Sequence, residues 1–221
     1  DEAFVPESQT KNHAIFLLEE KVNGNLKWEL GARFESQSID GDSFSKIDNQ
    51  GASFSIGSVY TLSEHNKLAV NLSSAVRFAS AEELLSNGAH LSTRTYELGN
   101  QELEEETSRN FDFSYRFEVD RLSGEVNFFW NDFKNFIYAA NVNELDPCVS
   151  TEAVEEAEHD ELQLVCYKQQ GAQFKGAELQ LEVTLNPESA HLFKVGLLAD
   201  FISAEFDSGF NIPRIPPMKT C

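Results

Sequence analysis

Residues 111–119 read FDFSYRFEV, so every second side chain is apolar or aromatic and every intervening one is polar. Such alternation places the two kinds of side chain on opposite faces of a β-strand. The same pattern occurs in residues 26–35, LKWELGARFE, and in residues 67–78, KLAVNLSSAVRF. The sequence therefore predicts an all-β protein built from long strands with one apolar and one polar face.

Eight such segments follow one another, and several exceed the five or six residues of an ordinary globular strand. A tilted strand of about ten residues crosses a bilayer. Short links alternate with long ones, as in an antiparallel transmembrane β-barrel, of which eight strands would form a part. The strands are expected at residues 12–22, 25–38, 51–63, 67–79, 107–119, 122–138, 162–185 and 190–204. The short links are 23–24, 64–66, 120–121 and 186–188, and the long ones are 39–50, 80–106 and 139–161.

A soluble β-sandwich or jelly roll is the rival architecture, because it also contains many alternating strands. The strand length and the alternation of short and long links favour the membrane barrel. In that case the polar positions face the lumen and the apolar ones face lipid. Five aromatic residues near strand ends would suit an interfacial girdle: Trp28, Tyr60, Phe78, Trp130 and Tyr138.

The net charge of the chain limits the classes of partner that it is expected to bind. It has 37 acidic and 17 basic residues, which gives a formal net charge of −20. A phosphate backbone is bound by clustered Lys and Arg, so no nucleic-acid partner is expected. Cations, basic partners or simple solubility fit better. The sequence contains neither a Gly-x-Ser-x-Gly elbow nor a His-Glu-x-x-His motif, and we expect a protein that is not an enzyme. No basic, apolar signal segment opens the chain, so any export signal is expected outside it.

Six pieces of sequence resemble, in this order, the barrel of a TonB-dependent outer-membrane receptor. They lie within residues 71–84, 86–88, 95–110, 124–138, 175–178 and 213–217, and include NLSSAVRFASAEEL, TYELGN, GEVNFFWNDF and PRIPP. The resemblance implies that residues 1–221 are an internal part of a barrel of about 22 strands. It also implies that the plug domain and the remaining strands are absent, that the TonB protein acts through that plug, and that the receptor lies among the lipids of the Gram-negative outer membrane.

Residues 87–93, NGAHLST, further resemble the zinc-uptake branch of these receptors. That resemblance implies zinc, as ion or complex, as transported cargo, with His90 as a direct ligand and Glu97 as a helper. Arg94 replaces the small residue usual before Thr95, which leaves the cargo open. Two alternatives therefore stand: a siderophore or haem receptor with the same barrel, or a soluble acidic β-sandwich that acts in adhesion.

The long link 139–161 is a second candidate metal site. It carries eight acidic residues and neither Lys nor Arg. Residues 151–161 lack Gly and Pro, which predicts a short helix. Glu155 and His159 would then share a face at i,i+4, where a carboxylate and an imidazole can hold zinc. The plainer alternative is a solvated acidic loop that collects cations at a distance.

Cys148 and Cys166 flank this link. On an exported protein, two cysteines that bracket a long loop most often pair. We expect a disulfide with Cα atoms within about 7 Å of each other. Metal binding by the two thiolates is the alternative. Cys221 has no evident partner.

Overall fold

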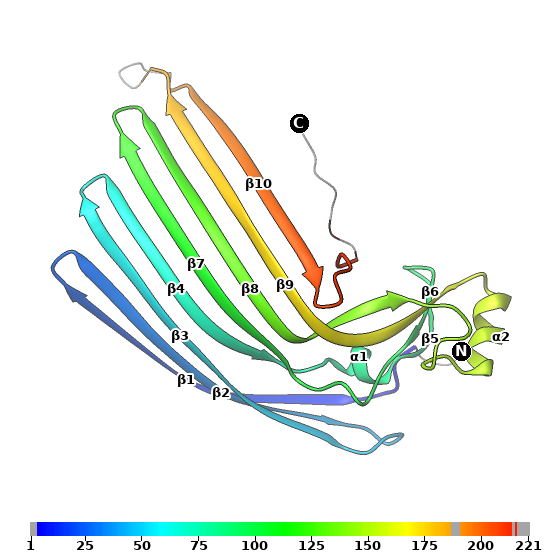
Figure 1. Cartoon of the computed structure of the whole chain (residues 1–221). Helices are drawn as coiled ribbons and strands as arrows, with labels where there is room; N and C mark the ends of the chain where they lie inside the picture. Colours follow the sequence, from blue (N-terminus) through cyan, green and yellow to red (C-terminus); the bar gives the residue numbers. More distant parts are fainter. Residues whose placement is uncertain (1–3, 187–190, 214, 216–221) are drawn as a thin grey trace.

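The computed structural model describes residues 4–186, 191–213 and 215, and these form one large sheet with two short helices (Figure 1). None of the helices in these ranges is long and apolar enough to cross a membrane. The strands are β1 (Gln9–Asn23), β2 (Leu26–Asp40), β3 (Ile47–Ser63), β4 (Asn66–Arg77), β5 (Asn87–His90), β6 (Thr95–Leu98), β7 (Glu106–Val119), β8 (Leu122–Asn141), β9 (Gln163–Thr184) and β10 (Lys194–Phe206). The helices are α1 (Ala81–Leu85) and α2 (Thr151–His159).

The eight long strands confirm the eight that the sequence predicts. Each pairs antiparallel with its neighbour, in the order β1-β2-β3-β4-β7-β8-β9, and β10 pairs with the free side of β9. The sheet is open, as expected for part of a barrel. Residues 187 and 188 of the predicted turn at 186–188 lie outside the described residues. Cys221 lies outside them as well. So do Arg214, Pro216 and Pro217 of the PRIPP motif.

Short turns and long connections lie at opposite ends of this sheet. The turns β1–β2, β3–β4 and β7–β8 and the paired ends of β9 and β10 gather at one end, and α1, α2, β5 and β6 gather at the other (Figure 1). Gly24 and Asp120 have positive φ in two of the tight turns, a conformation such turns require. This separation is the layout of an outer-membrane barrel, with its short turns on the periplasmic side.

The register gives the sheet one apolar and one polar face. At mid-height the paired residues of β2, β3, β4, β7 and β8 form an apolar row, which Glu19 of β1 and Lys175 of β9 flank, and the next row, pointing to the other face, is small or polar. The apolar row is Leu30, Ile56, Leu72, Phe111 and Trp130. The polar row is Gly31, Ser55, Ser73, Asn110 and Asn131. We call these the outward face and the lumen face. The residues of the apolar row are 37–49% exposed, which fits side chains that face lipid in a membrane barrel.

The long link 80–106 differs from the sequence expectation, because it is partly regular. It contains α1 and a β5–β6 hairpin, and β6 pairs parallel with the first residues of β9, Gln163 to Cys166. Strands of four residues are too short for alternation to reveal them. The link 139–161 contains the predicted helix, observed as α2.

The placement of Tyr138 in the outer aromatic girdle is wrong. A bulge between Phe133 and Phe136, where Asn135 has a φ of 57°, inserts one residue and exchanges the two faces. The Tyr138 ring therefore packs on the lumen side, with its centroid 4.6 Å from that of Phe206. Trp130 precedes the bulge and keeps its outward position.

The assignment of the faces can be tested at mid-height. Replacing Val70 by Arg puts a charge toward lipid, and we expect a loss of about 2–4 kcal/mol of folding stability. Replacing the next residue, Asn71, by Arg puts the same side chain on the lumen face and should have little effect. Urea unfolding of the intact receptor in lipid vesicles measures both. Equal losses, or a larger loss for Asn71→Arg, would contradict the assignment.

Candidate functional site

Helix α1 is fixed at the long-loop end of the sheet by a network of charges. Ser80 caps the helix and forms a capping box with Glu83. The Arg77 guanidinium, at the end of β4, contacts the carboxylates of Glu83 and Glu106. Glu106 is buried and accepts a hydrogen bond from the Ile137 backbone N–H. These contacts fix the helix that carries Glu82, the residue just before Glu83.

The β5–β6 hairpin presents a histidine and a carboxylate on neighbouring strands. His90 ends β5 and Glu97 lies in β6, whose parallel pairing with β9 anchors the hairpin to the wall. Arg94, just before β6, has a φ of 57°, and its carbonyl accepts a hydrogen bond from the Gln163 N–H. Glycine adopts such a backbone conformation most easily, so Arg94 is held in a conformation that residues with a side chain rarely adopt.

Three ligating side chains converge at this point. One ligand atom each of Glu82, His90 and Glu97 lies within 4.8 Å of the other two. His90 Nδ1 is 3.0 Å from Glu97 Oε1. The Tyr167 hydroxyl, from β9, lies 2.8 Å from Glu97 Oε2 and 3.1 Å from Glu82 Oε1, and it donates its proton to one of them. We call Glu82, His90, Glu97 and Tyr167 the rim cluster.

The carboxylate of Glu97 is kept charged by its surroundings. Its side chain is only 8% exposed. Burial raises the pKa of Glu97, but hydrogen bonds from Thr95, Tyr167 and His90 favour the ionised form and together lower the pKa below its ordinary value. A buried, ionised carboxylate beside an imidazole is suited to attract a cation.

His90 is held in a fixed orientation. Besides the Glu97 contact at Nδ1, its Nε2 lies 2.9 Å from the Ser92 hydroxyl. The ring of Phe4 stacks on the imidazole, with centroids 4.7 Å apart. The histidine side chain is one third exposed, so its edge remains accessible from solvent. A cation that enters between the carboxylates would displace the proton on Nδ1.

The sequence identified part of this cluster. His90 and Glu97, both expected as ligands, do lie together. Glu82 and Tyr167 were not expected. The capping box at residues 80–83 was a readable signal for a helix that would carry Glu82. Tyr167 had no such signal, since only the parallel pairing of β6 with β9 brings it near.

The second candidate pair lies apart from the rim cluster. Glu155 and His159 are both on α2, as expected from their spacing. The His159 side chain is 86% exposed, and its Nδ1 contacts Asp160 at 2.8 Å. Within the described part of the chain, neither residue belongs to a group of three ligating side chains. Their role as metal ligands stays a prediction.

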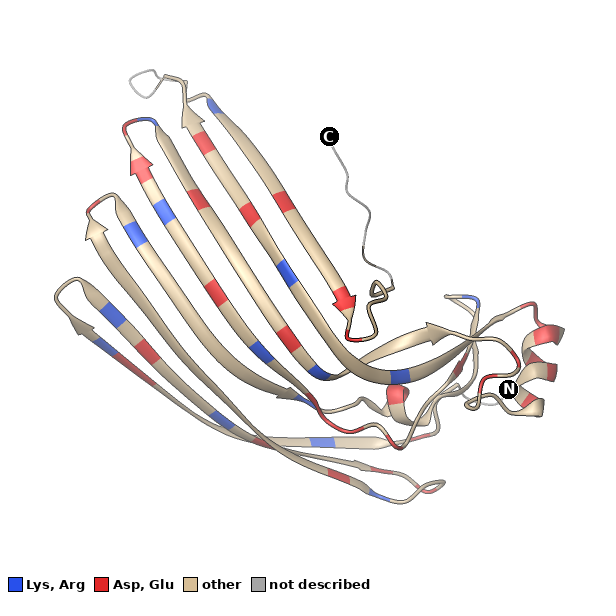
Figure 2. Cartoon of the chain, viewed as in Figure 1, with Lys and Arg blue, Asp and Glu red and all other residues tan. Residues whose placement is uncertain are grey.

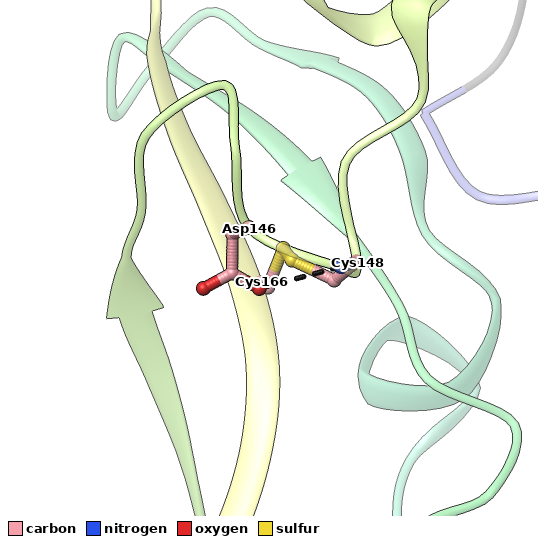
Figure 3. A group of neighbouring side chains, drawn as sticks. All are labelled: Asp146, Cys148 and Cys166. Atoms are coloured by element: carbon pink, nitrogen blue, oxygen red, sulfur yellow. Dashed lines mark hydrogen bonds between the residues drawn. A yellow bond between two sulfur atoms is a disulfide. The ribbon is translucent and has the colours of Figure 1, made fainter.

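The structure contains the disulfide Cys148–Cys166, with Cα atoms 6.5 Å apart (Figure 3). Cys166 is fully buried against Ala153 and Ala157 of α2. The carboxylate of Asp146 lies beside the sulfurs and accepts a hydrogen bond from the Cys148 N–H. Because both sulfurs are bonded to each other, this group is a covalent clamp between the α2 loop and β9.

Charge is distributed unevenly over the sheet. Lys and Arg are interspersed with Asp and Glu along the long strands, whereas α2 shows only acidic residues (Figure 2). Helix α2 lies at the same end of the sheet as the rim cluster (Figure 1). The acidic residues of α2 therefore add negative charge at this end of the molecule, and such charge attracts cations.

Removing the clamp should loosen this end of the molecule locally. For the variant Cys148→Ser/Cys166→Ser we expect faster amide hydrogen exchange in residues 142–162. The cost is about 3 kcal/mol by the chain-entropy estimate for a loop of this size. Exchange in β2 and β3, which lie far from the clamp in the sheet order, should not change and serves as the control. Unaltered exchange in α2 would show that packing alone holds the loop.

The solved structures that resemble this chain include proteins named as transporters and as receptors. The chain resembles the copper transporter OprC, with a TM-score of 0.75 and 14% identity over 95% of this chain and 31% of that one. The FrpB iron transporter from Neisseria meningitidis resembles it with a TM-score of 0.61 and 12% identity, over 91% of this chain and 27% of that one. For the Serratia marcescens hemophore receptor HasR the TM-score is 0.65 and the identity 17%, over 92% of this chain and 35% of that one. At this identity the likeness shows the fold alone, and the chain spans about a third of the length of these proteins.

Sequence comparison identifies the family directly. Residues 2–220 match the description "TonB dependent receptor-like, beta-barrel". This covers nearly the whole chain and agrees with the two-faced sheet and with a fold relative named as an outer-membrane receptor, FauA from Bordetella pertussis. The chain belongs to the TonB-dependent receptor β-barrel family.

Proposed function

We propose that the receptor to which this chain contributes takes up a divalent metal ion, with zinc as the first candidate, across the outer membrane. The rim cluster is the observation that carries this proposal. One imidazole and two carboxylates, with ligand atoms within 4.8 Å of one another, form a compact donor set. Zinc binds such nitrogen and oxygen donors, commonly with four ligands in all. Water, or a group that arrives with the metal, could therefore fill the fourth position.

Tyr167 supports the cluster without needing to contact the metal. Its hydroxyl bridges the two carboxylates, and it follows Cys166 on a strand that is part of the wall. A hydrogen bond from a neighbouring group orients a metal ligand and adjusts its basicity. The three ligands come from α1, β5 and β6, which the barrel wall supports from below. Capture would therefore occur on a fixed site at the outer rim.

The acidic α2 loop fits the role of a collector. Charge in this position raises the local concentration of cations but makes no coordinate bond. Transport itself would require the plug domain, which we place outside residues 1–221, and the TonB protein that acts on it. Solved relatives named for copper and for iron transport are compatible with metal cargo.

A siderophore or haem receptor is the alternative, since the fold relatives also include a hemophore receptor and a ferric citrate transporter. The rim cluster favours a bare ion, because its ligand atoms lie too close together to enclose a large organic complex. Copper(II) competes with zinc for imidazole sites and binds them more tightly. A titration therefore has to include both metals and haem.

The proposal predicts different effects for two histidines. In the intact receptor, His90→Ala should weaken zinc binding by tenfold or more, because it removes a coordinate bond. His159→Ala, which changes an exposed histidine of the same rim, is the matched control and should bind zinc nearly as before. Isothermal titration calorimetry with zinc, copper(II) and haem measures all of these affinities.

Ionic strength separates ligands from collecting charges. The loss caused by His90→Ala should persist at high salt, whereas the small loss expected for Glu155→Gln should fade as salt screens the charge. Equal and salt-sensitive losses for both variants would reduce His90 to an ordinary loop residue. A loss for His159→Ala as large as that for His90→Ala would move the site to α2.

A further inference from the structure

The segment that precedes β1 reaches the rim cluster from the far end of the sheet order. It comprises residues 4–8, which we call the strap, and Gln9 then begins β1 opposite Asp40 of β2. In the order of the sheet, β1 stands at one end and β5 at the other. The strap nevertheless contacts β5, because the Asn87 N–H donates a hydrogen bond to the Phe4 carbonyl, with N and O 3.0 Å apart. At the outer rim, the strap therefore joins two strands that are separate in the wall.

Close contacts hold the strap at both of its ends. Val5 packs against the buried cluster to which α1 also contributes. The Glu7 carbonyl lies against Gly41, where an added Cβ would be 2.7 Å from its oxygen. At the other end, a Cβ added to Gly88 of β5 would lie 3.3 Å from the Phe4 Cα. A glycine at each position leaves room for a second backbone, so the sequence is suited to the path of the strap.

The ring of Phe4 controls a direction in which the other contacts of His90 are weak. His90 Nδ1 lies 3.0 Å from Glu97 Oε1, and Nε2 lies 2.9 Å from the Ser92 hydroxyl. Both contacts act in the plane of the imidazole. Phe4 stacks on one face of that ring, with centroids 4.7 Å apart and planes inclined by 28°. The stacked ring opposes rotation of the imidazole out of its plane and shields one of its faces from water.

We propose that Phe4 is a positioning residue for the metal site. Its ring holds the His90 imidazole with Nδ1 directed at the Glu97 carboxylate, and the strap holds Phe4 in place. This inference rests on the proposed function, because it requires that His90 binds the metal. Without the Phe4 ring, the imidazole has to be ordered when the metal arrives, and the lost freedom weakens binding.

The effect of Phe4 on the metal has a necessary counterpart. If a closed strap strengthens metal binding, bound metal must stabilise the closed strap by the same factor. The strap leads directly into β1, so it connects the occupancy of the rim cluster to the opposite end of the sheet order. The proposal therefore assigns to residues 4–8 a response to metal that packing alone does not require.

A double-mutant cycle in the intact receptor tests whether Phe4 acts through His90. Zinc affinity is measured by isothermal titration calorimetry for the unaltered receptor, Phe4→Ala, His90→Ala and the double variant. Phe4→Ala should weaken zinc binding about two- to tenfold, the range expected for one aromatic contact. Once His90 is replaced, loss of the Phe4 ring should cause no further weakening, because the ring then has no ligand to orient.

Conservative variants separate the ring from its bulk. Phe4→Tyr keeps the aromatic face and should bind zinc as the unaltered receptor does. Phe4→Leu keeps an apolar side chain without that face, and it should weaken binding nearly as much as Phe4→Ala. Phe210→Ala is the matched control, since Phe210 is 73% exposed in the turn after β10, and it should leave zinc binding unchanged.

Hydrogen exchange measures the counterpart on the strap. Zinc should slow amide exchange in residues 4–8 and at Asn87 in the unaltered receptor, and much less in Phe4→Ala. If Phe4→Ala binds zinc normally while His90→Ala does not, the role of Phe4 is wrong and the metal site stands. Losses that simply add in the double variant would also overturn it, because Phe4 would then act on the fold. If His90→Ala binds zinc normally, the metal site is wrong and the role of Phe4 is wrong with it.

Discussion

The backbone of this chain has to satisfy its own hydrogen bonds, because the hydrocarbon that covers its outward face offers none. An unpaired N–H or C=O costs several kcal/mol in lipid, so only a continuous ladder of strands can cross as a sheet. The antiparallel pairing from β1 to β10 provides that ladder. Strands of 12 to 22 residues and their two-faced sequences follow from the same requirement. Only above the bilayer, where water is present, can the connections vary and carry a site.

Strand β9 links the membrane wall to that site. Its lower part, from Ala172 to Thr184, pairs with β10, while its first four residues pair with β6. β6 therefore continues the sheet where β10 no longer reaches. Cys166 holds α2, and the next residue, Tyr167, contacts the two carboxylates of the rim cluster. One strand thus fixes three parts of the outer rim relative to the bilayer, and it keeps the atoms of the rim cluster near one another.

The sequence predicted the elements that a repeated pattern or a local composition specifies, namely the long strands and the helix α2. Alternation over ten or more residues revealed all eight long strands, and the absence of Gly and Pro revealed α2. It could not reveal β5 and β6, because four residues are too few for a period of two to stand out. The inward turn of Tyr138 was missed for a related reason: a bulge at Asn135 reverses the two faces without leaving a clear mark in the sequence.

The site was predictable only where its residues are close in sequence. His90 and Glu97 are seven positions apart and come together through one hairpin. Glu82 and Tyr167 are 85 positions apart, and their contact depends on a parallel pairing between a loop strand and the wall. No periodicity in a single sequence reports such a contact. A set of ligands that comes from distant segments can therefore be identified only from the structure. The strands of the wall that supports it can be predicted from the sequence alone.

The central claim is that the rim cluster binds a metal ion. Anomalous diffraction from crystals of the intact receptor soaked in zinc, recorded on both sides of the zinc absorption edge, tests it most directly. The account predicts a zinc peak about 2.0–2.2 Å from a ring nitrogen of His90 and from carboxylate oxygens of Glu82 and Glu97. A fully occupied zinc peak beside His159 on α2, with none at His90, would contradict it.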